Sequence, residues 1–146
     1  DWLTKRKPEL RALFQHYMYG YLPQAANIAA KVTQTKTGLC GGAVTLKEVE
    51  LRFVDLPDDA PRMHLALFLP VKASRTHPVP VFLALNSCGN QEVLDDAAIT
   101  LDETAWRREQ CTPPVRGAAK DFWCVEYLAS RGYAFATFHE SEIDPD

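Results

Sequence analysis

The segment 79–85 reads Val-Pro-Val-Phe-Leu-Ala-Leu, and its unbroken apolar character constrains the fold more than any other stretch of the chain. A strand that is apolar on both faces is typical of a parallel sheet, which is covered on both sides. Tyr133–Phe138 is a second apolar strand, and a helix is expected between them at Lys120–Arg131. A strand, a helix and a strand in this order form a right-handed crossover between parallel strands. The sequence therefore predicts an α/β fold.

Two further elements precede this crossover. Apolar residues recur at helical spacing over Leu10–Tyr21, so we expect an amphipathic helix whose apolar side packs in the core. Apolar and polar residues alternate along Val44–Phe53 and along Met63–Leu69, with turn-forming residues between them, which predicts an antiparallel hairpin. The alternation changes phase within Val44–Phe53, and a β-bulge near Lys47–Glu48 is the expected reason. We treat residues 1–146 as one folding unit.

The serines indicate that a hydrolase nucleophile, if there is one, lies outside this chain. An α/β-hydrolase presents its serine in a Gly-x-Ser-x-Gly motif, because the sharp strand-to-helix turn needs small neighbours. The chain has Ser74, Ser87, Ser130 and Ser141, and none of them has the flanking glycines.

The loop that follows the first apolar strand is the main candidate for substrate contacts. In open parallel sheets ligands bind beyond the carboxyl ends of the strands. In α/β-hydrolases the loop at this position supplies one backbone N–H of the oxyanion hole, and a glycine lets the backbone approach a substrate closely. Asn86, Cys88, Gly89 and Asn90 are therefore the oxyanion-side candidates, with an ordinary Asn- and Gly-rich turn as the alternative. A nucleophilic Cys88 is disfavoured, because the fold places oxyanion donors here.

His139 and Glu140 follow the second strand and are the strand-end candidates for the cleft. A histidine beside carboxylates resembles acid–base apparatus, but in this fold the catalytic histidine follows the nucleophile in the chain, so a structural histidine is the alternative. Between the two strands, Val93–Ala119 has few apolar residues and a length typical of a functional or locally structured loop, with a short helix expected near Glu103–Glu109.

Composition excludes several classes of protein. A formal net charge of −3 gives no electrostatic basis for nucleic-acid binding, and no apolar stretch approaches the roughly 20 residues of a membrane-spanning helix. The cysteines contain no Cys-x-x-Cys pair and the histidines are scattered, so we expect no metal and no cofactor. Disulfides, which fit an exported protein, and buried free thiols remain alternative states of the four cysteines at positions 40, 88, 111 and 124.

Several short segments together resemble the opening part of the glucuronoyl esterase family. In chain order they are Tyr19-Gly20-Tyr21-Leu22-Pro23, Pro78-Val79-Pro80-Val81-Phe82-Leu83-Ala84-Leu85-Asn86 with Gly89-Asn90, Arg116-Gly117, Trp123, Arg131-Gly132-Tyr133-Ala134 and Asp144-Pro145-Asp146. Each segment is weak alone, but their order and spacing extend over nearly the whole chain.

The resemblance implies the N-terminal part of an α/β-hydrolase three-layer sandwich, in which an antiparallel hairpin leads into a parallel sheet. The family is similar in activity to 4-O-methyl-glucuronoyl methylesterase and cleaves glucuronate esters that link xylan to lignin, by a serine-histidine-acid mechanism without a metal. None of the triad positions is in this sequence, so they are expected after Asp146. The implied partners are the glucuronate-bearing polysaccharide and the remaining C-terminal polypeptide, and the implied location is secreted or periplasmic.

Two alternatives stay open at this point. Another α/β-hydrolase, such as an acyl esterase or a peptidase, would fit the same strands, because the motif that separates these enzymes is absent. A noncatalytic carbohydrate-binding or interaction module would suit the hairpin, although the apolar crossover strands argue against it.

Overall fold

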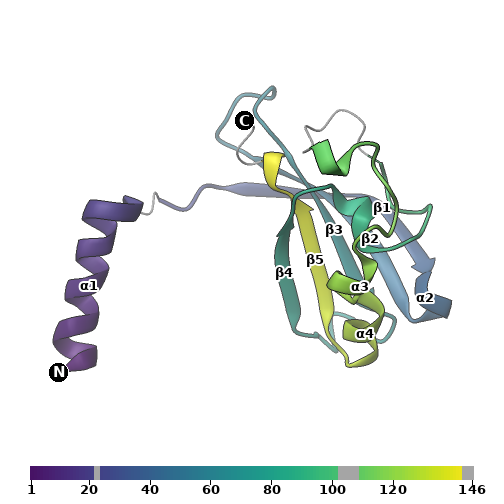
Figure 1. Ribbon diagram of the computed structural model, residues 1–146, viewed down its shortest axis with the longest axis horizontal. Coiled ribbons are helices and arrows are strands. Elements are labelled where there is room, and N and C mark those ends of the chain that lie inside the picture. Colours follow the sequence, from purple (N-terminus) through teal and green to yellow (C-terminus); the bar gives the residue numbers. More distant parts are fainter. Residues whose placement is uncertain (22–23, 102–108, 143–146) are drawn as a thin grey trace.

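The computed structural model describes residues 1–21, 24–101 and 109–142. Within them the chain forms a sheet in the order β1-β2-β3-β5-β4 (Figure 1). The strands are β1 (Ile28–Gly38), β2 (Val44–Phe53), β3 (Met63–Pro70), β4 (Val81–Asn86) and β5 (Ala134–His139). The pairs β1/β2, β2/β3 and β3/β5 are antiparallel, whereas β4 and β5 are parallel.

The helices are short apart from the N-terminal one. They are α1 (Lys7–Phe14), which is extended by helical turns at Trp2–Arg6 and Gln15–Tyr19, α2 (Leu39–Gly42), α3 (Lys120–Trp123) and α4 (Val125–Ser130). Single 3₁₀ turns lie at Asn90–Val93, Glu109–Cys111 and Glu140–Glu142. No helix of the described residues has the length and apolar character needed to span a bilayer.

The predicted crossover is confirmed. β4 and β5 run parallel from Val81 opposite Ala134 to Asn86 opposite His139, and the helices α3 and α4 connect them. The expected continuous helix is divided at Cys124, which has a left-handed φ of 50°. The mixed sheet and its crossover give the α/β fold class expected from the sequence.

The predicted hairpin is confirmed, but the predicted bulge is wrong. β2 and β3 pair without interruption from Val44 opposite Pro70 to Leu51 opposite Met63. The register shift lies instead in β1, between Val32 and Gln34. The phase change in β2 arises because both faces of this strand carry apolar residues, and only the end near Val44 lies under the helices.

One face of the sheet forms the core with α3 and α4. Phe68 of β3 is paired with Phe135 of β5, so their side chains share this face, with ring centroids 6.3 Å apart. Trp123 adds a third ring at 5.4 Å from Phe135, and Val125 is buried beside them. Full burial of such large apolar side chains contributes roughly 1.5–3 kcal/mol each, so this cluster stabilises the packing of the helices on the sheet.

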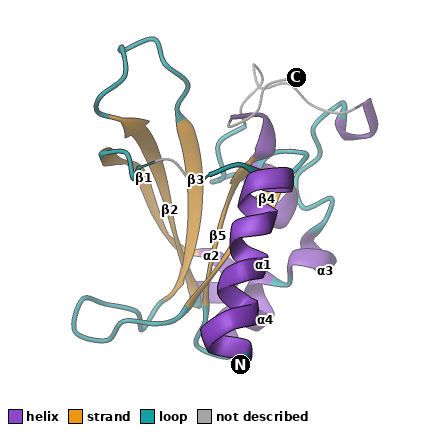
Figure 2. Cartoon of the chain, turned by 90° about the vertical axis from the view of Figure 1, so that its left-hand side faces the viewer, coloured by secondary structure: helices purple, strands orange, loops and turns teal. Residues whose placement is uncertain are grey.

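The other face of the sheet is apolar and open. Leu67, Ala136 and Leu83 are aligned across β3, β5 and β4, and side chains at such paired positions point to the same side. Both crossover helices lie on the opposite face (Figure 2), and Leu83 is 65% exposed. The expectation that this strand is covered on both sides therefore fails within the described residues. Within the described residues β1 and β4 are the edge strands of the sheet, and β5 lies between β3 and β4.

The N-terminal helix forms as predicted but does not pack as predicted. Figure 1 shows α1 standing apart from the sheet. Its apolar residues are exposed, with Tyr17 at 78% and Met18 at 66%. Helical periodicity fixes the amphipathic character of such a segment, but the surface that it contacts depends on tertiary structure.

Candidate active site

The two predicted loop segments meet at one edge of the sheet. Asn86 and His139 are the last residues of β4 and β5, and they are paired with each other. Because these strands are parallel, the loop 87–90 and the turn 140–142 begin side by side at the carboxyl ends. The structure thus brings the oxyanion-side candidates and the strand-end candidates together, as the sequence analysis expected.

The loop after β4 is held by the side chain of Asn86, which is only 2% exposed. Its Oδ1 accepts a hydrogen bond from the backbone N–H of Gly89 at 2.7 Å. Its Nδ2 donates to Oδ1 of Asn90 at 2.8 Å and to Oγ1 of Thr137 at 2.9 Å. Gly89 has φ of 99°, and a Cβ there would lie 2.5 Å from Oε1 of Gln91, so the loop requires glycine at this point.

A disulfide joins Cys88 to Cys111 and ties the same loop to the 3₁₀ turn at Glu109–Cys111. Cys88 therefore has no thiolate to offer, and a nucleophilic role for it is ruled out while the bond is intact. Cys40 and Cys124 are free thiols. Burial raises the pKa of the Cys40 thiol, helped by the nearby charges of Glu126 and Asp96, so this thiol is less reactive than an ordinary cysteine.

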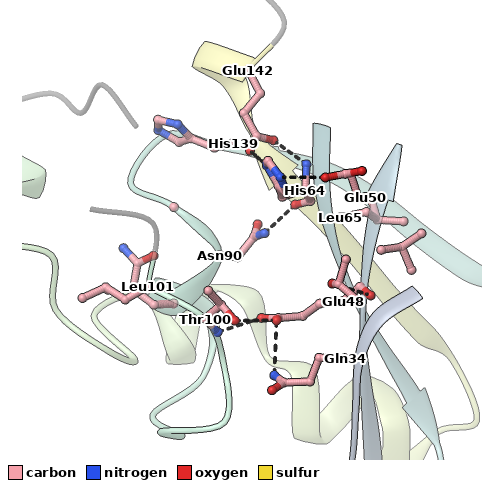
Figure 3. A pocket seen from close by; sticks show the side chains of 14 residues that line it. Gln34, Glu48, Glu50, His64, Leu65, Asn90, Thr100, Leu101, His139 and Glu142 are labelled. Atoms are coloured by element: carbon pink, nitrogen blue, oxygen red, sulfur yellow. Dashed lines mark hydrogen bonds and ion pairs between the residues drawn. The ribbon is translucent and has the colours of Figure 1, made fainter. Parts of the chain in front are cut away.

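A cavity of about 560 Å³ opens beside this edge, between the loops and strands β1 to β3. Figure 3 shows Glu48, Glu50 and Glu142 around it together with His64 and Asn90. His64 receives two contacts from one carboxylate, because its Nδ1 lies 2.7 Å from Oε1 of Glu142 and its backbone N–H donates to Oε2 at 2.9 Å. This carboxylate therefore joins the turn after β5 to strand β3.

Glu48 of β2 connects the sheet to the loop containing Thr100, which forms another wall of the cavity. The backbone N–H and the hydroxyl of Thr100 donate to its carboxylate at 2.7 and 2.6 Å. Nε2 of Gln34 also donates to Glu48, at 3.2 Å, and to the carbonyl of Ala98 at 2.6 Å. The carboxylates of Glu48 and Glu142 are therefore engaged in holding loops, and the negative charge of these side chains disfavours a free anion in the cavity.

His139 and Ser141 form a hydrogen-bonded pair that superficially resembles a catalytic dyad. Oγ of Ser141 lies 2.7 Å from Nδ1 of His139, and His139 is 3% exposed. Nε2 of His139 is buried with no hydrogen-bond partner among the described residues. An active dyad needs a third group that orients the histidine and a serine that substrate can reach. Ser141 is only 9% exposed, so the pair does not present a serine that a substrate can reach. Glu140 is half-buried in the turn beside it.

Glu92 lies behind the loop as a buried carboxyl group. It is 6% exposed, and Nε1 of Trp123 donates to its Oε1 at 3.0 Å. Burial raises the pKa of Glu92 above its ordinary value of 4.5, and the Trp123 hydrogen bond and the nearby His139 oppose this rise only in part. The native state therefore retains the proton on this carboxyl more strongly than the unfolded chain does.

We expect the Glu92→Gln variant to flatten the pH dependence of stability. Because the pKa is raised in the folded state, the free energy of unfolding of the wild type falls as pH rises from 4.5 through the folded-state pKa. Glutamine keeps an acceptor for Trp123 and carries no charge. Urea unfolding at pH 4 and pH 8 should show that the free energy of unfolding of the variant, relative to that of the wild type, is higher at pH 8 than at pH 4. The same substitution at the exposed Glu126 is the control, and an equal Glu92→Gln effect at both pH values would contradict the prediction.

Within the described residues, no group of three or more His, Cys, Asp or Glu side chains is arranged to hold a metal ion. Three sequence predictions lie wholly or mostly outside the described residues. They are the end of Tyr19-Gly20-Tyr21-Leu22-Pro23, the turn Asp144-Pro145-Asp146 and the helix near Glu103–Glu109, of which only Glu109 is described.

Sequence reasoning missed the cavity residues Glu48, Glu50 and Glu142. A signal for two of them was present, because Glu48 and Glu50 occupy the same face of β2 as Val44 and Leu46. A face that changes from apolar to acidic along one strand indicates a strand that leaves the core and enters a polar site. This change of character, and not a bulge near Lys47–Glu48, accounts for the phase change along β2.

Comparison with known proteins first identifies the class. No family model matches the chain. The chain is 34% identical over 154 residues to carbohydrate esterase MZ0003 from an unknown prokaryotic organism, and the match includes 100% of this chain but 35% of that protein. The chain thus spans about a third of the curated relative that it matches. Together with the mixed sheet and its crossover, this gives the chain the fold of one part of an α/β-hydrolase.

Solved structures then identify the particular family that it resembles. A glucuronoyl esterase from Solibacter usitatus superimposes with a TM-score of 0.81 and 34% identity, over 99% of this chain and 37% of the esterase. A promiscuous CE15 esterase from a marine bacterial metagenome gives the same TM-score at 35% identity, with the same coverage. The resemblance to glucuronoyl esterases found in the sequence is therefore confirmed in both sequence and fold.

Proposed function

We propose that residues 1–146 are one portion of a single α/β-hydrolase domain, in a protein that hydrolyses carboxylic esters of glucuronate. The preferred substrate is the ester between 4-O-methylglucuronate on xylan and an alcohol of lignin, as the likeness to glucuronoyl esterases suggests. The reaction uses a serine, a histidine and an acidic residue that are supplied by polypeptide outside this chain, with no metal and no cofactor.

The position of β4 at the sheet edge is the observation that carries this proposal. β4 runs parallel to β5, its other edge is unpaired, and its carboxyl end leads into the loop 87–90. A further parallel strand added beside β4 would end at the same edge, next to this loop. A serine in the turn after such a strand would therefore meet the loop's backbone N–H groups across a bound ester.

The chemical contribution of this chain is then the oxyanion side of the site. When the serine attacks the ester carbonyl, the carbonyl oxygen becomes an oxyanion that needs fixed donors. The backbone N–H groups of the loop 87–90 are such donors, except that of Gly89, which donates to Asn86. Gly89 lets the backbone come close to the substrate. Collapse of the tetrahedral intermediate expels the alcohol, which takes a proton from the histidine, and water then releases the uronic acid.

The partner needed to complete the domain is the remaining polypeptide of the same protein. The open sheet face around β4 supports this, because Val81, Leu83 and Leu85 are each more than half exposed. Such an apolar edge strand is prone to aggregation unless it is paired. A complementary segment that adds strands beside β4 and covers this face would pair the edge strand and bury its exposed apolar side chains.

The proposed location is an oxidising compartment, either outside the cell or in a periplasm. The Cys88–Cys111 disulfide supports this, because disulfides persist in such compartments and are rare in the cytosol of mesophiles. A polysaccharide substrate would also be met outside the cytoplasm.

The test compares esters of one uronic acid with other esters. The complete gene product should release acid from a methyl or benzyl ester of glucuronate at least about tenfold faster, in kcat/KM, than from an acetylated sugar, a difference of about 1.4 kcal/mol in transition-state binding. The Ser141→Ala variant should keep its rate within about twofold, because Ser141 is assigned no part in catalysis. Preference for the acetyl ester would support an acyl esterase instead, and loss of activity in Ser141→Ala would contradict the assignment of the nucleophile.

A further inference from the structure

Asn86 is the polar side chain on which the geometry of the loop 87–90 depends. It is the last residue of β4, and the side chain is 2% exposed. Its carbonyl oxygen accepts from Gly89 N–H, and its amide nitrogen donates to Asn90 and Thr137. Both donor hydrogens and the acceptor are thus in use within 3 Å.

These three bonds are specific to asparagine. Gly89 N–H requires an acceptor, while Oδ1 of Asn90 requires a donor, so the orientation of the Asn86 amide is set by its surroundings. An aspartate would keep the acceptor and lose the donor. A leucine of similar volume would leave the partners unpaired in a buried place, which is costly.

The bonds connect the loop to two strands of the sheet. Thr137 belongs to β5, so its bond with Asn86 ties the loop to the strand beside β4. Asn90 continues the connection, because its Nδ2 donates to the carbonyl of His64 in β3 at 2.6 Å. Inside the loop, Nε2 of Gln91 donates to the carbonyl of Cys88 at 2.6 Å. The peptide groups at 87–89 are therefore held by hydrogen bonds of the side chains on both sides of them, Asn86 before and Asn90 and Gln91 after.

We propose that Asn86 is a positioning residue for ester hydrolysis, which accepts the hydrogen bond from Gly89 N–H and so holds the loop 87–90 with its other backbone N–H groups facing the developing oxyanion. This inference rests on the proposed function and adds to it. Asn86 is buried beneath the loop and does not touch the substrate, so it acts through the backbone that it orients. Preorganised donors stabilise the transition state more than the ground state, so Asn86 should affect kcat more than KM.

The experiment uses the complete gene product with Asn86→Leu and Asn86→Asp. Loss of one oxyanion donor typically lowers kcat by about 100- to 1000-fold. Because Asn86→Leu displaces the loop, we expect it to lower kcat by about 100-fold and to change KM by less than about threefold. Asn86→Asp keeps the acceptor for Gly89 N–H and should recover at least about tenfold of that loss.

Two controls separate positioning from stability. Leu46→Ala removes a fully buried side chain of the core away from the loop, and its kcat should stay within about threefold of wild type when the protein is folded. Thr137→Val removes the bond to β5 and keeps the bond to Gly89, so its kcat should fall less than that of Asn86→Leu. Circular dichroism and thermal melts give the folded fraction for each variant.

The outcomes distinguish the inference from the proposed function. If wild type cleaves glucuronate esters and Asn86→Leu has the kcat of Leu46→Ala at equal folded fraction, the positioning role is wrong. If Asn86→Leu does not fold, Asn86→Asp and Thr137→Val carry the comparison, and wild-type kcat in both overturns the role. If wild type cleaves only a different ester, the proposed substrate is wrong, and the same comparison is made on that ester. A wild type that cleaves no ester overturns both.

Discussion

Purified alone, the 146-residue chain should release no acid from a methyl ester of glucuronate, whereas the complete product of the gene should release it. The reason is chemical, because neither a serine nor a cysteine among the described residues is arranged as an activated nucleophile, and the proposed role of this chain is limited to the oxyanion side. Ser141 is 9% exposed and hydrogen-bonded to the buried His139, and Cys88 is held in a disulfide. The acid released from the ester is measured by titration. We expect the complete protein to release acid faster than the background rate, and the isolated chain to show no release above background.

The control for this prediction is the state of the isolated chain. Circular dichroism must show the sheet, because an unfolded chain would also be inactive. Adding the complementary polypeptide should restore activity if the open face around β4 is where it assembles. A Leu83→Lys variant should weaken that restoration, since Leu83 is 65% exposed in this chain and would become buried in the assembled domain. Equal activity of the isolated chain and the complete protein would overturn the placement of the nucleophile outside this chain.

Removal of the Cys88–Cys111 disulfide should lower the free energy of unfolding by about 3 kcal/mol, the value that chain-entropy arguments give for a loop of about 23 residues. The Cys111→Ala variant, or reduction with dithiothreitol, tests this by chemical unfolding. The physical cause lies mainly in the unfolded chain, because the covalent link restricts the conformations that the segment 88–111 can adopt. The same link holds the loop 87–90 against the turn at Glu109–Cys111.

Cys124→Ala is the matched control for the disulfide prediction. Cys124 is exposed and its thiol is free, so this substitution should change the free energy of unfolding by less than about 0.5 kcal/mol. Reduction should leave the stability of the Cys111→Ala variant unchanged, because no disulfide remains in it. Equal stability of the wild type under oxidising and reducing conditions would contradict the assigned role of the bond.

The local elements of the fold were within reach of sequence reasoning because they depend on near neighbours. Alternation predicted the β2–β3 hairpin, and two apolar strands separated by a helix predicted the parallel pair β4/β5. The loop containing Gly89 and the turn after His139 were expected at one edge, since the ends of parallel strands coincide. These statements need only the period of the strand and the handedness of a crossover.

The predictions that failed are those about which surfaces of the chain pack against each other. The apolar side of α1 was expected in the core, yet Tyr17 in its C-terminal extension is 78% exposed. A periodic pattern indicates an amphipathic helix but does not indicate which surface the helix packs against. Segment 79–85 was expected to be covered on both faces, yet the strand β4 lies at the open edge of this chain. The cavity beside Glu48 and Glu142 combines residues almost a hundred positions apart, which no local pattern could bring together.

The sequence by itself determined the α/β class, the absence of a serine elbow and the two loops that border the site, because each is written in short-range pattern and residue chemistry. Only the tertiary structure decided that Asn86 uses its whole amide to hold the loop, that Cys88 pairs with Cys111, and that three glutamates surround a cavity. Hydrogen bonds and disulfides between residues far apart in the sequence form only where interatomic distances are correct to within a few tenths of an ångström. Those distances are set by the packing of β-strands and helices and have no counterpart in the order of residues along the chain.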